Sequence, residues 1–249
     1  MSEKKIALVT GASRGIGLEI AKELIKSGIS VIGTSRDKQL IEEIAASETT
    51  DGATLYPMQL DISDPIILEK NLSILGDLLP FPNILINNAG RVIYAEVHEL
   101  TDEIWNMHFD LNVGAAMRLC RRAIPELKKR PVGRIVNIGS AVTLRSSPGL
   151  AGYTSSKHAL EGLTRVLSQE LVPNITANCI HPGTILSGMT IPLMEEDPAL
   201  KEHYESFSPM GRLALPEDIS HAALFLSLDA SSFINGIGLN VDGGYVAYG

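Results

Sequence analysis

A tyrosine and a lysine lie four residues apart in this chain, as Tyr153 and Lys157. Residues with that spacing share one face of a helix, so the ammonium would lie close to the phenol. A nearby positive charge favours the ionised phenol and lowers its pKa, and such a tyrosine can exchange a proton with a substrate oxygen. The same spacing also occurs by chance on solvated helix faces, so other residues must decide between these two interpretations.

A glycine-rich turn near the start of the chain is suited to binding a dinucleotide. The apolar run 5–10 is typical of a buried parallel strand, and Gly11, Gly15 and Gly17 follow it where a helical pattern begins. Such a turn brings the backbone close to a pyrophosphate, and the helix N-terminus adds free N–H groups and partial positive charge. The Gly-x-x-x-Gly-x-Gly spacing differs from the common dinucleotide fingerprint, and a turn that serves packing alone is the alternative.

These features belong to a longer series of motifs that fall in one order along the chain. They are Thr10–Gly17, Asn87-Asn88-Ala89-Gly90, Asn112, Ser140, Tyr153 with Lys157, and His181-Pro182-Gly183. With them the chain resembles short-chain dehydrogenases/reductases over essentially its whole length. Within that family it is most similar to 3-oxoacyl-carrier-protein reductase-like carbonyl reductases. The resemblance implies a single-domain Rossmann fold and a nicotinamide dinucleotide as cofactor.

Strand-like and helix-like segments alternate along the 249 residues, which predicts an α/β fold with a doubly wound parallel sheet of about seven strands flanked by helices. The expected strands are 5–10, 29–34, 54–60, 83–88, 133–139, 175–181 and 237–242. The expected helices are 15–27, 37–47, 64–78, 101–129, 153–172 and 216–228. We expect one domain over 1–249, in which the proline-containing stretch 184–213 forms a substrate lid or, alternatively, a surface insertion.

Composition excludes several classes of function. The net charge of −8 argues against sequence-independent binding of nucleic acid, which needs a basic surface. The chain opens directly into its first expected strand, and no apolar run approaches the about 20 residues of a membrane span, so we expect a cytoplasmic protein. Cys120 and Cys179 are expected to be buried free thiols. We interpret His158 and His181 as structural and expect no metal site, because no carboxylate or cysteine stands at ligand spacing from them.

The residues after the second expected strand favour NADP over NAD. Enzymes that use NAD usually carry an acid at this strand end, where it binds the ribose 2′-hydroxyl, whereas this chain has Ser35. Arg36 follows, and Arg14 lies in the glycine turn, so two guanidinium groups could bind a 2′-phosphate. The alternative is that both arginines are solvated and that Asp37 neutralises Arg36.

The resemblance implies a cofactor site spread over the ends of several strands. Its residues are Gly11, Ser13, Arg14, Gly15, Ile16, Gly17, Ser35, Arg36, Asp61, Ile62, Asn88, Ala89, Gly90, Tyr153, Lys157, Pro182, Gly183, Thr184 and Ile185. By this resemblance Asp61 bonds the adenine amino group, and 182–185 lie beside the nicotinamide. Family members often carry a threonine where this chain has Ser187, which keeps a hydroxyl.

The resemblance also implies four catalytic residues. Ser140 would donate a hydrogen bond to the substrate oxygen, and Tyr153 would exchange a proton with it, while the cofactor carries the hydride. Lys157 would lower the pKa of Tyr153 and hold ribose hydroxyls, and Asn112 would anchor a water that connects Lys157 to solvent. The alternatives are a helix cap for Ser140 and a helix-interior amide for Asn112.

The expected activity is NADPH-dependent reduction of a ketone or 3-oxoacyl group to a secondary alcohol. Two alternatives remain: a sugar, polyol or steroid alcohol dehydrogenase of the same family, and a catalytically silent nucleotide-binding scaffold. The resemblance implies a homotetramer that pairs through 101–129, 153–172 and the 236–244 segment. Basic residues between 118 and 130 could dock an acidic acyl carrier protein, but 172–174 lack the arginine that many carrier-protein reductases have.

Overall fold

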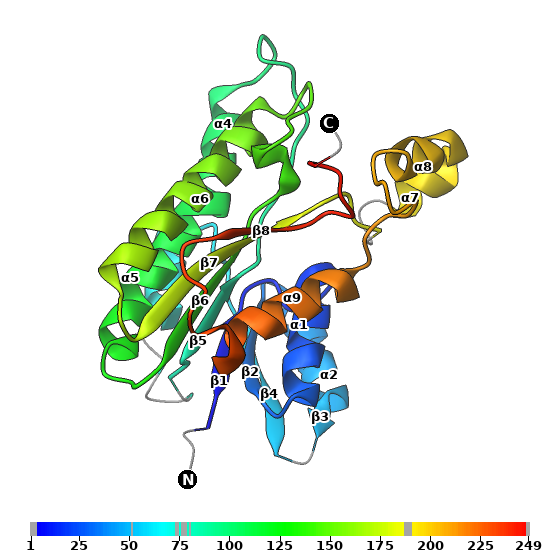
Figure 1. The fold of residues 1–249 in the computed structure, drawn as a ribbon. Helices are drawn as coiled ribbons and strands as arrows, with labels where there is room; N and C mark the ends of the chain where they lie inside the picture. Colours follow the sequence, from blue (N-terminus) through cyan, green and yellow to red (C-terminus); the bar gives the residue numbers. More distant parts are fainter. Residues whose placement is uncertain are drawn as a thin grey trace.

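Seven parallel strands form a sheet through the middle of the protein, and helices cover both of its faces (Figure 1). This computed structural model describes residues 4–50, 52–72, 75, 79, 81–186 and 191–247. The strands, in their order across the sheet, are β4 (Ala53–Gln59), β2 (Ser30–Ser35), β1 (Ile6–Val9), β5 (Ile84–Asn87), β6 (Gly133–Ile138), β7 (Ile175–Pro182) and β8 (Gly238–Val241). The predicted doubly wound parallel sheet is confirmed.

One strand was not predicted. β3 (Thr49–Thr50) pairs antiparallel with β4 at the edge of the sheet, and two residues are too few to give a periodic pattern. The strand order reverses between β1 and β5, which are hydrogen-bonded to each other. In such sheets the crevice at this reversal, beyond the carboxyl ends of the strands, is where ligands bind.

The helices include the six predicted segments, one of them divided, and two short helices within 184–213 that were not predicted. They are α1 (Gly15–Lys26), α2 (Lys38–Ser47), α3 (Pro65–Leu72), α4 (Asp102–Phe109), α5 (Ala115–Leu127), α6 (Ala151–Glu170), α7 (Ile191–Glu196), α8 (Pro198–Glu205) and α9 (Pro216–Ser227). The single helix expected over 101–129 is interrupted by a π-helical turn, η1 (Asp110–Gly114), between α4 and α5. The end of the expected helix 64–78 lies largely outside the described residues.

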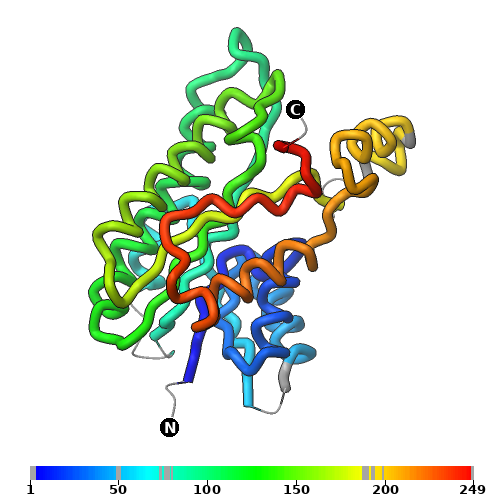
Figure 2. The backbone as a smooth tube through the Cα atoms, viewed as in Figure 1, coloured from blue at the N-terminus to red at the C-terminus, as the bar shows by residue number. Residues whose placement is uncertain are grey.

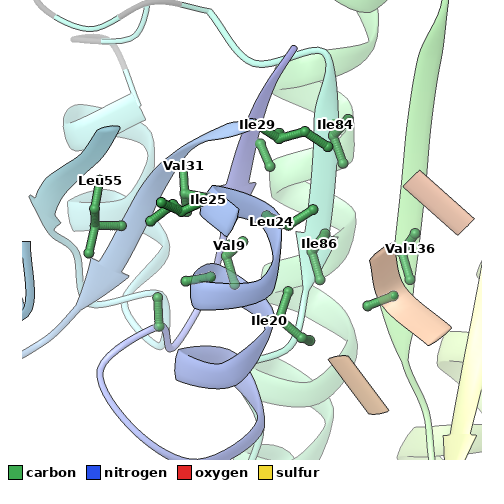
Figure 3. Close-up of a cluster of buried hydrophobic side chains, with 14 of the residues drawn as sticks. Val9, Ile20, Leu24, Ile25, Ile29, Val31, Leu55, Ile84, Ile86 and Val136 are labelled. Atoms are coloured by element: carbon green, nitrogen blue, oxygen red, sulfur yellow. The ribbon is translucent and has the colours of Figure 1, made fainter. Parts of the chain in front are cut away.

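Two apolar clusters hold the helices on the sheet. Side chains of α1, α2 and α9 pack on one face, where Ile20, Leu24 and Ile25 of α1 lie against Val9 and Ile86 of neighbouring strands (Figure 3). Side chains of α3, α5 and α6 pack on the other face. The central strands β1, β2, β5, β6 and β7 are largely buried on both sides because helices cover both faces. None of the described helices is long and apolar enough to cross a membrane.

The 184–213 segment leaves the sheet after β7 and returns to it before α9. It carries the short helices α7 and α8, which stand apart from the helices that cover the sheet (Figure 2). Ala214 closes the excursion: its N–H donates to the carbonyl oxygen of Thr184 at 3.0 Å. Residues 187–190, including the Ser187 hydroxyl expected beside the nicotinamide, lie outside the described residues.

Candidate active site

The predicted site residues gather at one edge of the sheet because its strands are parallel. The glycine turn follows β1, Ser35 ends β2, Asn88 follows β5, Ser140 follows β6, and Pro182 ends β7. Carboxyl ends of parallel strands share an edge, so five separate stretches of sequence meet there.

The glycine turn is shaped by backbone conformation and by close packing. Gly11 and Gly15 have positive φ angles of +68° and +54°, a region in which other residues are strained. A Cβ on Gly17 would lie 2.2 Å from the carbonyl oxygen of Gly11 and 2.5 Å from Nδ2 of Asn88. That amide donates to the carbonyl oxygen of Thr10 at 2.8 Å. Only glycine therefore fits at position 17.

The turn also fits the phosphate groups of a dinucleotide. α1 begins after Arg14 without a side-chain cap, and its first turn contains no acidic residue. The first N–H groups of the helix therefore face outward with a partial positive charge, as an anion-binding helix end requires. The Thr10 hydroxyl fixes the adjoining strand end by accepting from the N–H groups of Asn88 and Ala89, both at 2.9 Å.

Ser35 lies against the glycine turn. Its hydroxyl donates to Oγ of Ser13 at 3.1 Å and accepts from the N–H of Asp37 at 3.1 Å. Asp37 caps α2 by accepting from the N–H of Leu40 at 3.1 Å, so its carboxylate is engaged there. Among the described residues, Arg36 has no ion pair with Asp37, contrary to the alternative considered from the sequence. The guanidinium groups of Arg14 and Arg36 make no hydrogen bond or ion pair with any described residue.

Asp61 is an ionised acceptor after β4. Its Oδ1 accepts from the N–H and the hydroxyl of Ser63, at 2.9 and 2.6 Å. The Ser63 hydrogen bonds lower the pKa of the carboxyl, and the charge of Arg36 lowers it further. The side chains of Ile62 and Ile185 are instead buried in the two apolar clusters, so only their backbones are available to a ligand.

Tyr153, Lys157 and Ser140 lie together at the ends of α6 and β6. The Ser140 side chain is near enough to the Tyr153 hydroxyl to lower the pKa of that phenol. Nζ of Lys157 lies 5.7 Å from the centre of the Tyr153 ring and donates to the carbonyl oxygen of Ile138 at 2.7 Å. A Cβ on Gly90 would lie 3.4 Å from the same nitrogen, so the end of β5 closes over the ammonium.

Desolvation dominates the protonation of this pair. It raises the pKa of Tyr153 to about 12, against the lowering effect of the Ser140 side chain. It lowers the pKa of Lys157 to about 8. The expectation that Lys157 lowers the pKa of Tyr153 is therefore wrong for the protein alone: the ammonium bonds to Ile138, and the loss of water outweighs its charge. Tyr153 is a protonated acid at neutral pH.

Asn112 lies in the π-helical turn and connects three segments. Its Oδ1 accepts from the N–H of Arg91 at 2.9 Å, and its Nδ2 donates to the Arg91 carbonyl oxygen at 3.1 Å and to Oγ of Ser156 at 3.0 Å. Turns of this kind widen a helix and are frequent at functional sites. Asn112 is thus no helix-interior amide bonded to its own helix. Its expected role in anchoring a water remains a prediction.

The turn after β7 packs against the end of β8. The N–H of Gly183 donates to the carbonyl oxygen of Val241 at 3.1 Å, and a Cβ on Gly183 would lie 2.9 Å from the Cα of Asp242. Thr184 lines a cavity of about 550 Å³ together with Tyr204 and other residues of the 204–214 and 240–245 stretches. The expected nicotinamide turn therefore opens toward the 184–213 segment.

His108 was missed from the sequence. Its Nε2 accepts from the N–H of Ile93 at 3.1 Å, and its buried ring lies edge-on to Tyr153 with 6.1 Å between ring centres. A Cβ on Gly152 would lie 2.7 Å from Nδ1 of this histidine. The glycine directly before Tyr153 was the available signal, since it marks a close approach to the backbone.

The remaining cysteine and histidine residues singled out in the sequence are either buried in the core or exposed on α6. Cys120 and Cys179 are buried free thiols, as predicted. His158 lies on the exposed side of α6, with Nδ1 2.9 Å from the carbonyl oxygen of Thr154. His181 has a carboxylate beside it that no sequence spacing indicated: Oε2 of Glu161 lies 3.6 Å from its Nε2. The two are distant in sequence, and the packing of α6 on β7 brings them together.

The sheet order, the glycine turn and the Ser140, Tyr153 and Lys157 grouping define a class of oxidoreductase. The chain belongs to the short-chain dehydrogenase/reductase family, and a family profile described as enoyl-(acyl carrier protein) reductase matches residues 11–246. It is therefore an NAD(P)-dependent oxidoreductase that acts on alcohol and carbonyl groups.

The chain is similar to 3-oxoacyl-(acyl carrier protein) reductases in sequence and to putative gluconate dehydrogenases in structure. The 3-oxoacyl-(acyl carrier protein) reductase of Escherichia coli strain K12 is 35% identical over 243 residues, with 97% of each chain covered. The enzyme of that name from Chlamydia trachomatis is 34% identical over 243 residues, with 96% of each covered. Among solved structures, a putative gluconate dehydrogenase from Agrobacterium tumefaciens has a TM-score of 0.93 at 29% identity, covering 98% of this chain and 96% of its own. A putative NAD(P)-dependent gluconate 5-dehydrogenase from Beutenbergia cavernae, with bound NADP, has a TM-score of 0.89 at 32% identity, covering 98% and 97%.

Proposed function

We propose that the chain is an NADPH-dependent reductase that converts a ketone or 3-oxoacyl group into a secondary alcohol. The observation that carries this proposal is the grouping of Tyr153, Ser140 and Lys157 at the ligand-binding edge of the sheet, with Nζ of Lys157 5.7 Å from the centre of the Tyr153 ring. A phenol with a raised pKa is a proton donor at neutral pH, which suits reduction of a carbonyl.

Each side chain has a distinct part in the proposed reaction. A reduced nicotinamide, when bound, would supply a hydride to the carbonyl carbon. Ser140 and Tyr153 would donate hydrogen bonds to the carbonyl oxygen, and Tyr153 would transfer its proton as negative charge develops there. The Ser140 side chain lowers the pKa of Tyr153 and so favours the tyrosinate that remains. Lys157, with a pKa of about 8, is charged at neutral pH and would stabilise the same anion.

The cofactor site is proposed residue by residue as the sequence predicted. The glycine turn would hold the pyrophosphate, and Asp61 the adenine. Arg14 and Arg36, whose guanidinium groups are unengaged among the described residues, would hold the 2′-phosphate beside Ser35. The absence of an acid at Ser35 and the NADP named for the Beutenbergia cavernae relative both support NADPH over NADH.

The names of the relatives suggest two candidate classes of substrate for this chain. The sequence relatives are named as 3-oxoacyl-(acyl carrier protein) reductases, and the structural relatives as gluconate dehydrogenases. Docking of a carrier protein is weakly supported, because the basic residues that could receive it are partly paired: Arg121 lies 2.6 Å from Glu69, and Lys129 lies 2.6 Å from Glu126. A free thioester, ketone or keto-sugar acid is the better supported substrate.

We also propose a domain organisation, an oligomeric state and a location for the chain. We infer one NAD(P)-binding domain over residues 1–249, a lid at about 184–213, a homotetramer, and a cytoplasmic location. The placement of Thr184 at the base of a cavity lined by Tyr204 and Phe207 supports the lid, because both come from that segment.

An NADPH-oxidation panel tests the proposal. Its substrates are acetoacetyl thioesters, cyclic ketones, diketones and 5-keto-gluconate, each assayed with NADPH and with NADH at equal concentration. We expect turnover with at least one carbonyl compound and a clear preference for NADPH. Equal rates with both cofactors would overturn the cofactor preference, and no turnover across the panel would overturn the reductase assignment.

A further inference from the structure

A series of polar side chains runs from the exposed Arg165 on α6 to the backbone of Ser140, behind the proposed reaction centre. Arg165 forms an ion pair with Glu161, whose Oε2 lies 3.6 Å from Nε2 of His181. Nδ1 of that histidine lies 3.4 Å from Oγ1 of Thr143. The Thr143 hydroxyl donates to the carbonyl oxygen of Ser140 at 2.9 Å. The proposed oxyanion-binding residue is thus connected to a buried histidine and a carboxylate.

Two glycines leave the space that the imidazole occupies. His181 is only 1% exposed. A Cβ on Gly139 would lie 2.6 Å from its Nδ1, and a Cβ on Gly238 would lie 2.4 Å from its Nε2. The flanking strands, β6 and β8, are therefore shaped around both ring nitrogens at the level of Ser140.

The hydrogen atoms available on Thr143 and His181 limit which hydrogen bonds these two side chains can make at the same time. The Thr143 hydroxyl has one hydrogen, and the Ser140 carbonyl can only accept it. While that bond is made, the contact between His181 and Thr143 needs a proton on Nδ1. A second proton on Nε2 then gives an imidazolium paired with Glu161. If His181 is neutral with its proton on Nε2, the Thr143 hydroxyl must turn toward Nδ1 and leave the Ser140 carbonyl.

We propose that Glu161, His181 and Thr143 are positioning residues for Ser140, and that protonation of His181 sets the direction of the Thr143 hydroxyl. In the protonated state the Ser140 carbonyl is held by the side chain and the backbone N–H of Thr143, the latter at 3.1 Å. In the neutral state with the proton on Nε2, the tautomer that the Glu161 carboxylate favours, only the backbone bond remains, and the Ser140 hydroxyl is less firmly aimed at the substrate oxygen. This proposal rests on the proposed function and deepens it.

The charges around His181 act in opposite directions. On α6, Glu161 favours the imidazolium, whereas Lys157 and Arg165 disfavour it. On β7, the neighbouring thiol of Cys179 stays neutral, because burial raises its pKa to about 12. The pKa of His181 is lowered overall, because burial outweighs the opposing effect of the Glu161 carboxylate. Glu161 is therefore the group that keeps the protonated state accessible.

The first test removes the hydroxyl of Thr143. Wild-type protein, Thr143→Val and the matched control Thr143→Ser are assayed with NADPH and ethyl acetoacetate from about pH 5.5 to about pH 8.5. We expect Thr143→Val to lower kcat about fivefold below the pKa of His181, the effect of one hydrogen bond, with the KM for NADPH nearly unchanged. The difference from wild type should vanish at the alkaline end, and Thr143→Ser should restore the wild-type profile.

Other outcomes of that assay would overturn the proposal. A kcat loss of the same size at every pH, a parallel rise in the KM for NADPH, or a failure of Thr143→Ser to restore activity would mean that Thr143 serves general stability. Equal profiles for all three proteins would mean that the hydroxyl does not position Ser140.

The second test needs no turnover and so separates this proposal from the proposed function. NMR spectra of the full chain with ¹⁵N-labelled histidine follow the protonation of His181, assigned with His181→Asn. We expect Glu161→Gln to shift that protonation to lower pH, because the carboxylate favours the imidazolium. An unchanged titration in Glu161→Gln would overturn the coupling between the two residues, even if a ketone is reduced.

Discussion

At the scale of residues, desolvation sets which groups carry protons at the proposed reaction centre. The phenol of Tyr153 keeps its proton to a pKa of about 12, while the ammonium of Lys157 gives up its proton at about 8. The two shifts have one cause, because a buried site disfavours both tyrosinate and ammonium. Burial of the Lys157 ammonium disfavours the folded protein as long as that group is charged.

The free energy of unfolding should rise with pH as Lys157 loses its proton. Between a pKa of about 8 in the folded protein and 10.5 in the unfolded chain, only the unfolded chain keeps that proton, so stability increases through this window. From about pH 7 to about pH 9.5 the gain is about 2 kcal/mol. Urea unfolding of wild type and Lys157→Met at both pH values measures this gain. It is the rise in the free energy of unfolding of wild type between the two pH values, minus the rise in Lys157→Met. Parallel pH dependence in the two proteins would contradict the depressed pKa.

At the scale of elements, turns and caps place the site. The glycine turn after β1, the cap of α2 by Asp37 and the π-helical turn before α5 each hold one group of residues at the ligand edge. The strands and most helices follow from apolar periodicity. The π-helical turn does not, because its residues continue the helical pattern of the flanking segments, and only tertiary contacts such as those of Asn112 distinguish it.

Gly17→Ala should damage the cofactor site. Its Cβ would lie 2.2 Å from the carbonyl oxygen of Gly11, so the turn must open at a cost of about 1–3 kcal/mol. We expect NADPH affinity, measured by fluorescence titration, to fall about tenfold or more. Gly162→Ala on α6 is the control, because nothing lies within 4 Å of its added Cβ and alanine favours a helix. Wild-type affinity in Gly17→Ala would rule out this close approach as a requirement.

Ser35→Asp should reverse the proposed cofactor preference. A carboxylate at the end of β2 would repel a 2′-phosphate and could accept hydrogen bonds from a 2′-hydroxyl. We expect the ratio of kcat/KM for NADPH to that for NADH to fall about 10- to 100-fold. Arg36→Ala should lower the same ratio, and Arg36→Lys is its charge-conserving control. An unchanged ratio in Ser35→Asp and Arg36→Ala would place cofactor discrimination elsewhere.

At the scale of the whole molecule, the proposed tetramer needs two different contacts on each subunit. Val166, 52% exposed on α6, and Phe233, fully exposed before β8, are apolar side chains on or beside the segments expected to form those contacts.

Light scattering at micromolar concentration should therefore give the mass of four chains. Phe233→Ser should reduce that mass to two chains by removing apolar area from one contact. Ile66→Ser on α3 is the control, since Ile66 is also exposed, at 79%, but lies on neither proposed surface. A wild-type mass of one chain would refute the assembly.

The sheet and the location of the site could be predicted from sequence because both depend on local patterns and on the rule that ligands bind at strand ends. The partners of individual side chains could not. His181 meets Glu161 and Thr143 only after three elements pack together, and the pKa of Tyr153 depends on how much water that packing excludes. Motifs located Tyr153 and Lys157, but the net shift in the pKa of Tyr153 is upward because desolvation dominates it.

The central claim is that Tyr153 delivers the proton, and Tyr153→Phe tests it most directly. Turnover of NADPH with the best carbonyl substrate of the panel is compared with NADPH affinity from fluorescence, using Tyr56→Phe on β4 as the control. We predict that Tyr153→Phe loses about 10²- to 10⁴-fold in kcat while it still binds NADPH and that Tyr56→Phe keeps wild-type activity. A Tyr153→Phe protein that reduces the substrate at the wild-type rate would contradict the account.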